Sequence, residues 1–325
     1  MKVLFATYPM AFHTPGGGEI QLLAYYKHLK AQGVDVTLFD PWNPRFLEHD
    51  VVHFFSCIGG SFHLCNFIKQ LGLPLVITST LWITPETTHL YAMDEIRAQL
   101  SLADRIITNS ELESDTLSQV LSLPREKFSV VYNGIDEFFL QTVNPNLFRE
   151  TFHIPERFVL NVGNIEPRKN QLNLVRAMKA FPEHKLVLIG HQRDPRYAEQ
   201  VLAEGGEQVR YLGPMPHNEI LLSAYRASEF FCLPSTLETP GLAALEAAAQ
   251  GARLLVTSEG SCQEYFGDAA EYVNPFSVED LRAALERMFL TANLKKNSSF
   301  QAEKFLWRNT VSALRENYDF CSRKG

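Results

Sequence analysis

Residues 233–251, with the sequence LPSTLETPGLAALEAAAQG, contain the end of an apolar strand and the helix that follows it. The strand ends at Leu233, and turn-forming residues separate it from the helix. We expect the helix to begin near Gly241 and to end at Gly251, because glycine favours the left-handed conformation that closes a helix. A strand, a turn and a helix in this order form the repeating unit of a doubly wound parallel sheet.

Short apolar runs that alternate with longer, helix-like segments continue on both sides of this stretch. In the first half they are residues 3–6, 35–39, 51–55, 75–78, 105–108 and 128–131, and in the second half residues 157–162, 185–189, 208–212, 229–233 and 253–257. Because the segments between them are long enough for crossover helices, each series predicts a parallel sheet covered on both faces. We therefore expect two doubly wound α/β units, with a hinge near residues 137–156.

The composition supports a folded chain and excludes some partners. Its 325 residues suggest about two domains, and 46% hydrophobic residues can bury a core. A net charge of -7 argues against duplex nucleic acid as a partner. No apolar run is long enough to span a membrane, and the N-terminal residues do not resemble a signal peptide. We expect a cytoplasmic protein, with at most peripheral contact with the inner face of the membrane.

The cations are concentrated in the second half of the chain. Residues 1–150 contain 10 Lys and Arg against 16 Asp and Glu, whereas the remainder contains 20 against 21. This distribution matters if an anionic ligand binds in the second half, where most of the cations lie.

The start of the helix after Leu233 is suited to bind such an anion. The backbone N–H groups of Gly241 and Leu242 lie at the positive end of the helix dipole, whereas Pro240 has no N–H to donate. Glu238 precedes the helix, and Glu246 lies about 7 Å further along its axis. Carboxylates on either side of a diphosphate can accept hydrogen bonds from hydroxyl groups. The alternative is a loop glutamate and a solvated helix glutamate without a ligand.

A second polar segment, NVGNIEPRKN at residues 161–170, follows one predicted strand and precedes a helix. Arg168 and Lys169 are adjacent cations near the carboxyl end of the strand, and Gly163 permits close approach to the backbone. They predict a clamp for an anion, and a solvated basic turn is the alternative. The location of this segment in the same unit as Glu238 favours the clamp.

A third segment places Gly16, Gly17 and Gly18 between the first predicted strand and a helix. Glycines there let the backbone approach a ligand, and a flexible loop is the alternative. The spacing does not match Gly-x-Gly-x-x-Gly, so a nicotinamide dinucleotide site is poorly supported. His13, beside these glycines, is a candidate acid or base, whereas His53 lies in an apolar strand and is interpreted as a core histidine.

Several other kinds of site are not supported by the sequence. No Asp-x-Asp occurs, so a metal-bridged nucleotide diphosphate is not expected. Neither a Gly-x-Ser-x-Gly nor a P-loop pattern occurs, which argues against the common hydrolases and NTPases. The five cysteines form no Cys-x-x-Cys pair, so neither a zinc site nor a disulfide framework is indicated.

Taken in order, these segments resemble glycosyltransferase family 4, the retaining transferases with the GT-B fold. The likeness is carried by PGGGE (15–19), DVVHFF (50–55), ADRIITNSELESD (103–115), VVYNGID (130–136), VGNIEPRKNQ (162–171) and ETPGLAALE (238–246), the last with Glu-x7-Glu spacing. It implies two Rossmann-like doubly wound parallel-sheet domains that face a central cleft. These are an acceptor-side domain (1–150) and a nucleotide-sugar domain (151–300), followed by a C-terminal helix (301–325) that packs back on the first domain.

The resemblance also implies roles for individual residues. Catalysis would depend on Arg168 and Lys169, which neutralise the diphosphate of the donor, and on Glu238, which holds the transferred sugar. Glu246 would bind the ribose hydroxyls. Further contacts with the donor would come from Gly17, Gly18, Gly163, Leu212, Pro240, Gly241 and Leu242.

The implied reaction moves a sugar from a UDP- or GDP-linked donor to a hydroxyl of a carbohydrate, lipid-linked or other acceptor, in glycan or glycoconjugate synthesis. The nucleotide sugar is a co-substrate, and neither a metal ion nor a resident cofactor is implied. Many family members carry a histidine where this sequence has Thr80. Thr80 and Trp82 are therefore acceptor-side candidates beside His13. The departure keeps open a nucleotide-sugar-binding protein with impaired catalysis, and a sugar-nucleotide epimerase of the same fold is a further alternative.

Overall fold

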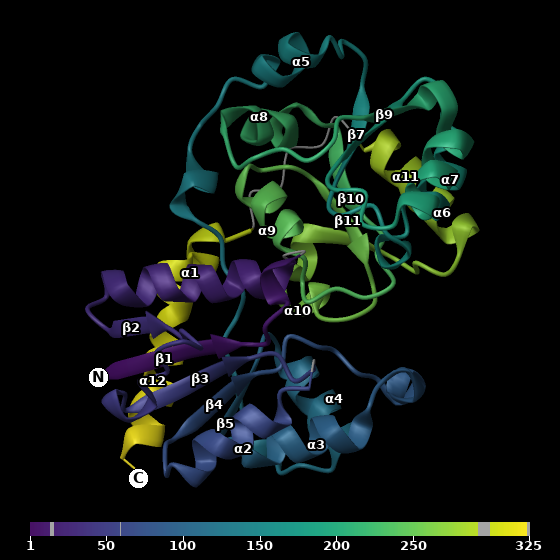
Figure 1. The fold of residues 1–325 in the computed structure, drawn as a ribbon. Coiled ribbons are helices and arrows are strands. Elements are labelled where there is room, and N and C mark those ends of the chain that lie inside the picture. The colour runs from purple at the N-terminus through teal and green to yellow at the C-terminus, as the bar shows by residue number, and fades with distance from the viewer. Residues whose placement is uncertain (14–15, 59, 292–299, 324–325) are drawn as a thin grey trace. The chain divides into compact units, whose positions relative to one another are not determined.

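The computed structural model describes residues 1–13, 16–58, 60–291 and 300–323. The chain forms two compact units (Figure 1), Met1–Gly134 with Lys304–Gly325 (unit 1) and Ile135–Glu303 (unit 2). Each unit is built on one sheet of six strands, and all the paired strands are parallel.

The sheet of unit 1 has the order β2-β1-β3-β4-β5-β6. Its strands are β1 (Lys2–Thr7), β2 (Asp35–Leu38), β3 (Val51–Phe55), β4 (Leu75–Thr78), β5 (Arg105–Thr108) and β6 (Phe128–Val130). Its helices are α1 (Gly17–Ala31), α2 (Phe62–Gln70), α3 (Met93–Leu102), α4 (Glu111–Leu121) and α12 (Trp307–Ser322).

Both faces of this sheet are covered, because successive side chains of a strand point to opposite faces. On one face Leu4, Phe54 and Ile77 belong to a buried cluster with residues of α2, α3 and α4. On the other face Phe55 contacts Tyr25 of α1, whose ring meets Trp307 of α12 edge-on. Figure 1 shows α1 and α2–α4 on opposite sides of the sheet.

His53 is a core histidine, as the sequence predicts. It is fully buried in β3, with Nδ1 2.6 Å from the Tyr318 hydroxyl and Nε2 2.7 Å from Thr78 Oγ1. Burial lowers the pKa of His53 to about 3, so the ring is neutral. Four residues of α12 are buried, Trp307, Val311, Leu314 and Tyr318, and their side chains fix α12 on unit 1.

The sheet of unit 2 has the order β12-β11-β10-β7-β8-β9. Its strands are β7 (Phe158–Val162), β8 (Lys185–Ile189), β9 (Val209–Tyr211), β10 (Phe230–Leu233), β11 (Leu254–Thr257) and β12 (Ala270–Val273). Its helices are α5 (Asn146–Phe152), α6 (Gln171–Met178), α7 (Pro195–Gly205), α8 (Glu219–Ala227), α9 (Leu242–Ala249), α10 (Cys262–Phe266) and α11 (Val278–Leu290).

Helices cover both faces of this sheet as well. Residues of α6, α7 and α11 form a buried cluster with side chains of β7, β8 and β10. On the other face Tyr225 of α8 meets Phe231 of β10, and Phe148 of α5 meets Phe158 of β7. Short 3₁₀ helices in the two units span Ala11–His13, Phe46–Glu48, Pro85–Leu90, Arg125–Lys127, Glu137–Leu140, Pro167–Lys169, Gly206–Gln208, Gly267–Ala269 and Ala302–Phe305.

The structure confirms the predicted strands and adds one. Every apolar run predicted as a strand forms one, and its ends agree to within one residue. Strand β12 was not predicted because only Val273 of its four residues is buried, which leaves a weak apolar signal at the edge of the sheet. Helix α9 ends as expected, with Gly251 at φ +72° just beyond it.

Candidate functional site

The candidate site lies where the order of strands in unit 2 reverses. Strands β7 and β10 are neighbours, and the chain continues from them toward opposite edges of the sheet. In open parallel sheets, ligands bind at the carboxyl ends of the strands at such a point. The segment that carries Arg168 and Lys169 follows β7, and the segment that carries Glu238 follows β10.

Two features fix the segment after β7. Gly163 lies beside the Lys169 side chain, since a Cβ built on Gly163 would be 3.5 Å from Lys169 Cε. Asn170, at φ +60°, lies directly before α6, and its side-chain amide donates to the carbonyls of Pro234 (3.0 Å) and Pro275 (2.7 Å). The segment that carries the two cations is therefore tied to the loops that follow β10 and β12.

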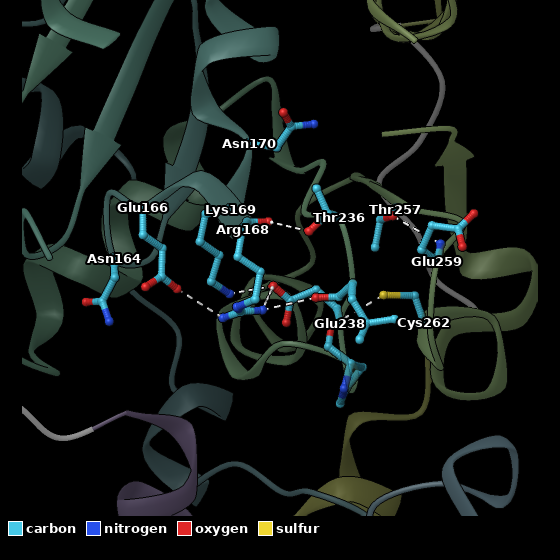
Figure 2. A network of polar contacts seen from close by, with 12 residues as sticks. Asn164, Glu166, Arg168, Lys169, Asn170, Thr236, Glu238, Thr257, Glu259 and Cys262 are labelled. Atoms are coloured by element: carbon cyan, nitrogen blue, oxygen red, sulfur yellow. Dashed lines mark hydrogen bonds and ion pairs between the residues drawn. The ribbon is translucent and has the colours of Figure 1, made fainter. Parts of the chain in front are cut away.

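Both predicted cations contact one carboxylate (Figure 2). Glu238 Oε1 lies 2.5 Å from Lys169 Nζ and 3.3 Å from Arg168 Nη1. The other arm of Arg168 contacts Glu166, which also lies 3.6 Å from Arg193. The side chains of Glu238 and Lys169 are 6% and 13% exposed, whereas that of Arg168 is 48% exposed. The clamp thus consists of a largely buried ion pair, Lys169 with Glu238, and a half-exposed arginine, Arg168.

Two backbone hydrogen bonds hold Glu238 in place. Its carbonyl accepts from Ser261 N (2.9 Å) and its N–H donates to the Glu259 carbonyl (3.3 Å). A Cβ on Gly260 would lie 2.1 Å from the Glu238 carbonyl oxygen, so this approach requires glycine. Burial alone would raise the pKa of the Glu238 carboxyl, but Lys169 and then Arg168 more than offset burial and hold it below its ordinary value.

Helix α9 begins directly beside this carboxylate. Gly241 precedes the helix at φ +85°, and a Cβ there would lie 2.7 Å from Leu233 Cδ2 and 3.1 Å from Glu238 Oε2. The preceding Thr239–Pro240 peptide is cis, and the Pro240 carbonyl accepts from Cys262 Sγ at 3.4 Å. Arg168, Lys169, Glu238, Gly163 and Gly241 are therefore brought together, with Pro240 and Leu242 adjacent in the chain.

Glu246 has different neighbours from Glu238. Its carboxylate accepts from the Tyr225 hydroxyl at 2.7 Å and lies 3.5 Å from His217 Nε2. Burial raises the pKa of the Glu246 carboxyl above its ordinary value, and His217 and Tyr225 offset part of this effect. His217 belongs to the loop that leaves β9 at Leu212, whose N–H donates to the Leu188 carbonyl at 3.0 Å. The two signature glutamates are both buried but are held by separate sets of partners.

Sequence reasoning missed His217 and Tyr225. His217 follows β9, so its place after the carboxyl end of a strand was a usable signal. Tyr225 gave none, because it lies among the apolar residues of α8 and looks like a core residue.

The remaining candidates lie in unit 1. Gly17 and Gly18 form the first turn of α1, and a Cβ on Gly18 would lie 3.3 Å from Thr80 Cγ2. Thr80 therefore lies against this turn, two residues after β4. His13 is exposed in the short helix Ala11–His13, and Trp82 is half-buried. Pro15 of the predicted glycine loop lies outside the described residues.

Neither a cluster suited to a metal ion nor a helix suited to a membrane occurs among the described residues. No group of three or more His, Cys, Asp or Glu among them could hold a metal ion. Within the same residues, no helix is both long enough and apolar enough to cross a membrane.

Two family models match the chain. The model described as glycosyl transferases group 1 matches residues 145–305, and that of glycosyltransferase family 4 matches residues 44–137.

Curated relatives agree with these models. A serotype-specific mannosyltransferase WbdA of Escherichia coli is 26% identical over 67% of this chain and 28% of its own length. D-inositol 3-phosphate glycosyltransferases of Mycolicibacterium smegmatis and Gordonia bronchialis are 27% and 29% identical over 66% and 76% of this chain. The matched part of this chain spans 52% and 61% of their lengths. The chain thus covers only about a quarter to three fifths of these relatives.

Solved structures share the fold. Sucrose-phosphate synthase from Thermosynechococcus elongatus superposes with a TM-score of 0.85 at 19% identity, and each chain covers 100% of the other. Alr3699/HepE of Anabaena in complex with UDP superposes with a TM-score of 0.80 at 18% identity, over 98% of this chain and 100% of the other. The predicted GT-B class, with two Rossmann-like parallel sheets, is confirmed.

Proposed function

Because the chain belongs to glycosyltransferase family 4, we propose that it transfers a sugar from a nucleotide-diphosphate sugar to an acceptor hydroxyl. The proposal includes retention of configuration at the anomeric carbon and a reaction without a metal ion or a resident cofactor. It also includes a cytoplasmic location. The absence of Asp-x-Asp from the sequence supports the metal-independent form of the reaction.

The observation that carries the proposal is the meeting of Arg168, Lys169 and Glu238 at the start of α9. This is the strand reversal of unit 2, where a parallel sheet binds ligands. Two cations beside a helix start suit a diphosphate, since the ammonium, the guanidinium and the N–H groups all donate to phosphate oxygens.

In the proposed reaction the acceptor oxygen bonds to the anomeric carbon while the bond from that carbon to the phosphate oxygen breaks. The proton of the acceptor moves to the departing phosphate, so the step needs no protein nucleophile. Lys169 and Arg168 stabilise the charge that develops on the leaving diphosphate. To do so they must exchange part of their contact with Glu238 for the phosphates, which frees the Glu238 carboxylate for hydroxyls of the transferred sugar.

Glu246 is the proposed partner of the ribose hydroxyls. Its buried carboxylate already accepts one hydroxyl, that of Tyr225, at 2.7 Å, and His217 lies on its other side. We place the acceptor on unit 1, and we propose a carbohydrate, lipid-linked or other hydroxyl compound as the acceptor in glycan synthesis. The curated relatives named as a mannosyltransferase and as D-inositol 3-phosphate glycosyltransferases support this class.

The test is a panel of UDP- and GDP-linked sugars incubated with hydroxyl acceptors, with and without a chelator. Mass spectrometry should detect a transfer product, and NMR should show that this product keeps the anomeric configuration of the donor. The chelator should leave the rate of transfer unchanged. Inversion or loss of activity with the chelator would overturn the corresponding part of the proposal. Incubation with donor alone separates an epimerase, which changes the sugar without an acceptor.

A nucleotide-sugar-binding protein without turnover is the second candidate, and Thr80 favours it because many family members have a histidine there. It predicts that a nucleoside diphosphate binds, that no acceptor yields a product, and that the donor is not hydrolysed.

A further inference from the structure

Unit 1 holds two strained residues that helix geometry does not explain. Within the described part of the chain, the residues other than glycine with positive φ are Ser56, Thr80, Ser122, His153 and Asn170. The last three each follow the C-terminal end of a helix, α4, α5 or the 3₁₀ helix Pro167–Lys169, where a left-handed residue is ordinary. Ser56 (φ +90°) and Thr80 (φ +50°) instead follow β3 and β4, which are neighbours in the sheet. Strain of this kind persists only where the surroundings enforce it, and it gathers at functional sites.

Buried polar side chains form hydrogen bonds at both of these turns. Thr80 follows Ser79, whose hydroxyl donates to Glu113 Oε1 at 2.7 Å and whose N–H donates to the Ile107 carbonyl at 3.1 Å. The Ser56 carbonyl accepts from Gln99 Nε2 at 3.0 Å. Glu113, Gln99 and Ser79 are each at most 1% exposed.

Glu113 does more than cap its helix. The N-terminal cap of α4 is Ser110, whose hydroxyl accepts from Glu113 N at 3.0 Å. The Glu113 carboxylate accepts from Asn109 N (2.8 Å) and extends beyond the helix to Ser79 at the end of β4. A buried carboxylate is costly unless it is hydrogen-bonded, so this placement favours a role outside the cap.

The two turns also contact each other and α1. Cys57 Sγ, next to Ser56, lies 3.3 Å from the Ser79 carbonyl. The Thr80 side chain lies against Gly18 in the first turn of α1. These groups lie at the carboxyl edge of the sheet, beside the reversal between β1 and β3, where ligands bind in this class of fold. Residues 51–85 contain one Lys and no Arg, so this edge suits a neutral hydroxyl compound better than a phosphate.

We propose that Glu113, acting through Ser79, is a positioning residue that holds Thr80 in its left-handed conformation for binding the acceptor. Gln99 holds the neighbouring turn through the Ser56 carbonyl. The inference rests on the proposed function, because it assigns the acceptor to this edge of unit 1.

The test compares Glu113→Gln with a matched control, Glu111→Gln, an exposed glutamate on the same helix that pairs with Arg125. Loss of one charge-assisted hydrogen bond should lower kcat/KM for the acceptor about tenfold in Glu113→Gln, with the Kd of the donor changed by less than about twofold. Glu111→Gln should match the wild type. In a Thr80→Gly background, Glu113→Gln should have no further effect, because glycine adopts this conformation without support. Equal losses in both backgrounds, or a loss of donor binding, would overturn the inference.

Two measurements keep the test independent of folding and of turnover. Ser79→Ala removes the same hydrogen bond without changing the carboxylate, and it should reproduce the loss if Glu113→Gln is unstable. Hydrogen exchange of the amides of residues 79–82 should be about tenfold faster in Glu113→Gln than in Glu111→Gln. Unchanged exchange would overturn the holding role of Glu113, whether or not the wild type transfers a sugar. Absence of sugar transfer by the wild type would contradict only the proposed function.

Discussion

The two units place their candidate residues at the same position of the fold but use different chemistry. In unit 2 the strand reversal between β7 and β10 is charged, with Arg168 and Lys169 on Glu238. In unit 1 the reversal between β1 and β3 is bordered by neutral, strained residues, Ser56 and Thr80, supported from the buried interior. The topology sets where a ligand can bind, and the residues at the strand ends decide which kind.

The charged edge should be the more sensitive of the two. Lys169→Ala should lower the rate of sugar transfer about 100- to 1,000-fold, as removal of one preorganised donor to a developing charge does. The matched control is Lys179→Ala, which removes a lysine that pairs with Glu204 on the surface of the same unit. Steady-state kinetics with saturating acceptor measure the difference. Equal rates for the two variants would contradict a catalytic role for Lys169.

Glu238 should oppose the binding of the diphosphate while it supports transfer. Because its carboxylate occupies both cations, Glu238→Gln should bind inorganic pyrophosphate about tenfold more tightly, the equivalent of one competing charge-assisted hydrogen bond. The transfer rate should fall, since the sugar loses an acceptor group. Isothermal calorimetry measures the affinity, with Glu204→Gln as the control for loss of one negative charge. Weaker binding of pyrophosphate by Glu238→Gln would contradict the competition.

Gly241 of unit 2 should tolerate replacement by alanine less well than Gly18 of unit 1. Gly241→Ala should cost about 2 kcal/mol of the free energy of unfolding or more, because φ is +85° and the new Cβ meets Leu233 Cδ2 at 2.7 Å. Gly18→Ala should change the free energy of unfolding by less than about 1 kcal/mol. Alanine favours the helix, and the new Cβ would lie 3.3 Å from Thr80 Cγ2, a close contact but not an overlap. Urea unfolding of both variants checks the order, and a larger loss for Gly18→Ala would reverse it.

The two signature glutamates should give opposite slopes of stability with pH. Glu238 has a lowered pKa in the folded state, so its contribution is present above pH 4.5 and is lost as the pH falls below it. Glu246 has a raised pKa, so the folded state binds more protons just above pH 4.5 and stability decreases there as the pH rises. The test is the urea midpoint of unfolding measured as a function of pH. Glu238→Gln should reduce the change of the midpoint with pH below pH 4.5, and Glu246→Gln should reduce it just above pH 4.5. The reverse assignment would contradict the two environments.

Much of the fold could be predicted from the sequence because buried parallel strands are short, continuous apolar runs. The exception, β12, has one buried residue and gives no such run. The residues of the charged site could also be located, since Arg168, Lys169 and Glu238 follow strands whose carboxyl ends share an edge. Their mutual pairing could not, because chain spacing does not determine which side chains meet. The role of Glu113 could not be predicted for the same reason. In the sequence it resembles an ordinary residue in the first turn of a capped helix, and Ser79, which it contacts, lies 34 residues away.

The most direct test of the account is a calorimetric titration of a nucleoside diphosphate into two double variants and the wild type. Arg168→Ala/Lys169→Ala removes the cations that contact Glu238, and Arg176→Ala/Lys179→Ala removes an equal charge from the pair that contacts Glu204. The account predicts that the first variant loses about 100-fold or more in affinity, from two charge-assisted contacts, while the second binds like the wild type. Equal affinities for the two variants, or no binding by the wild type, would contradict it.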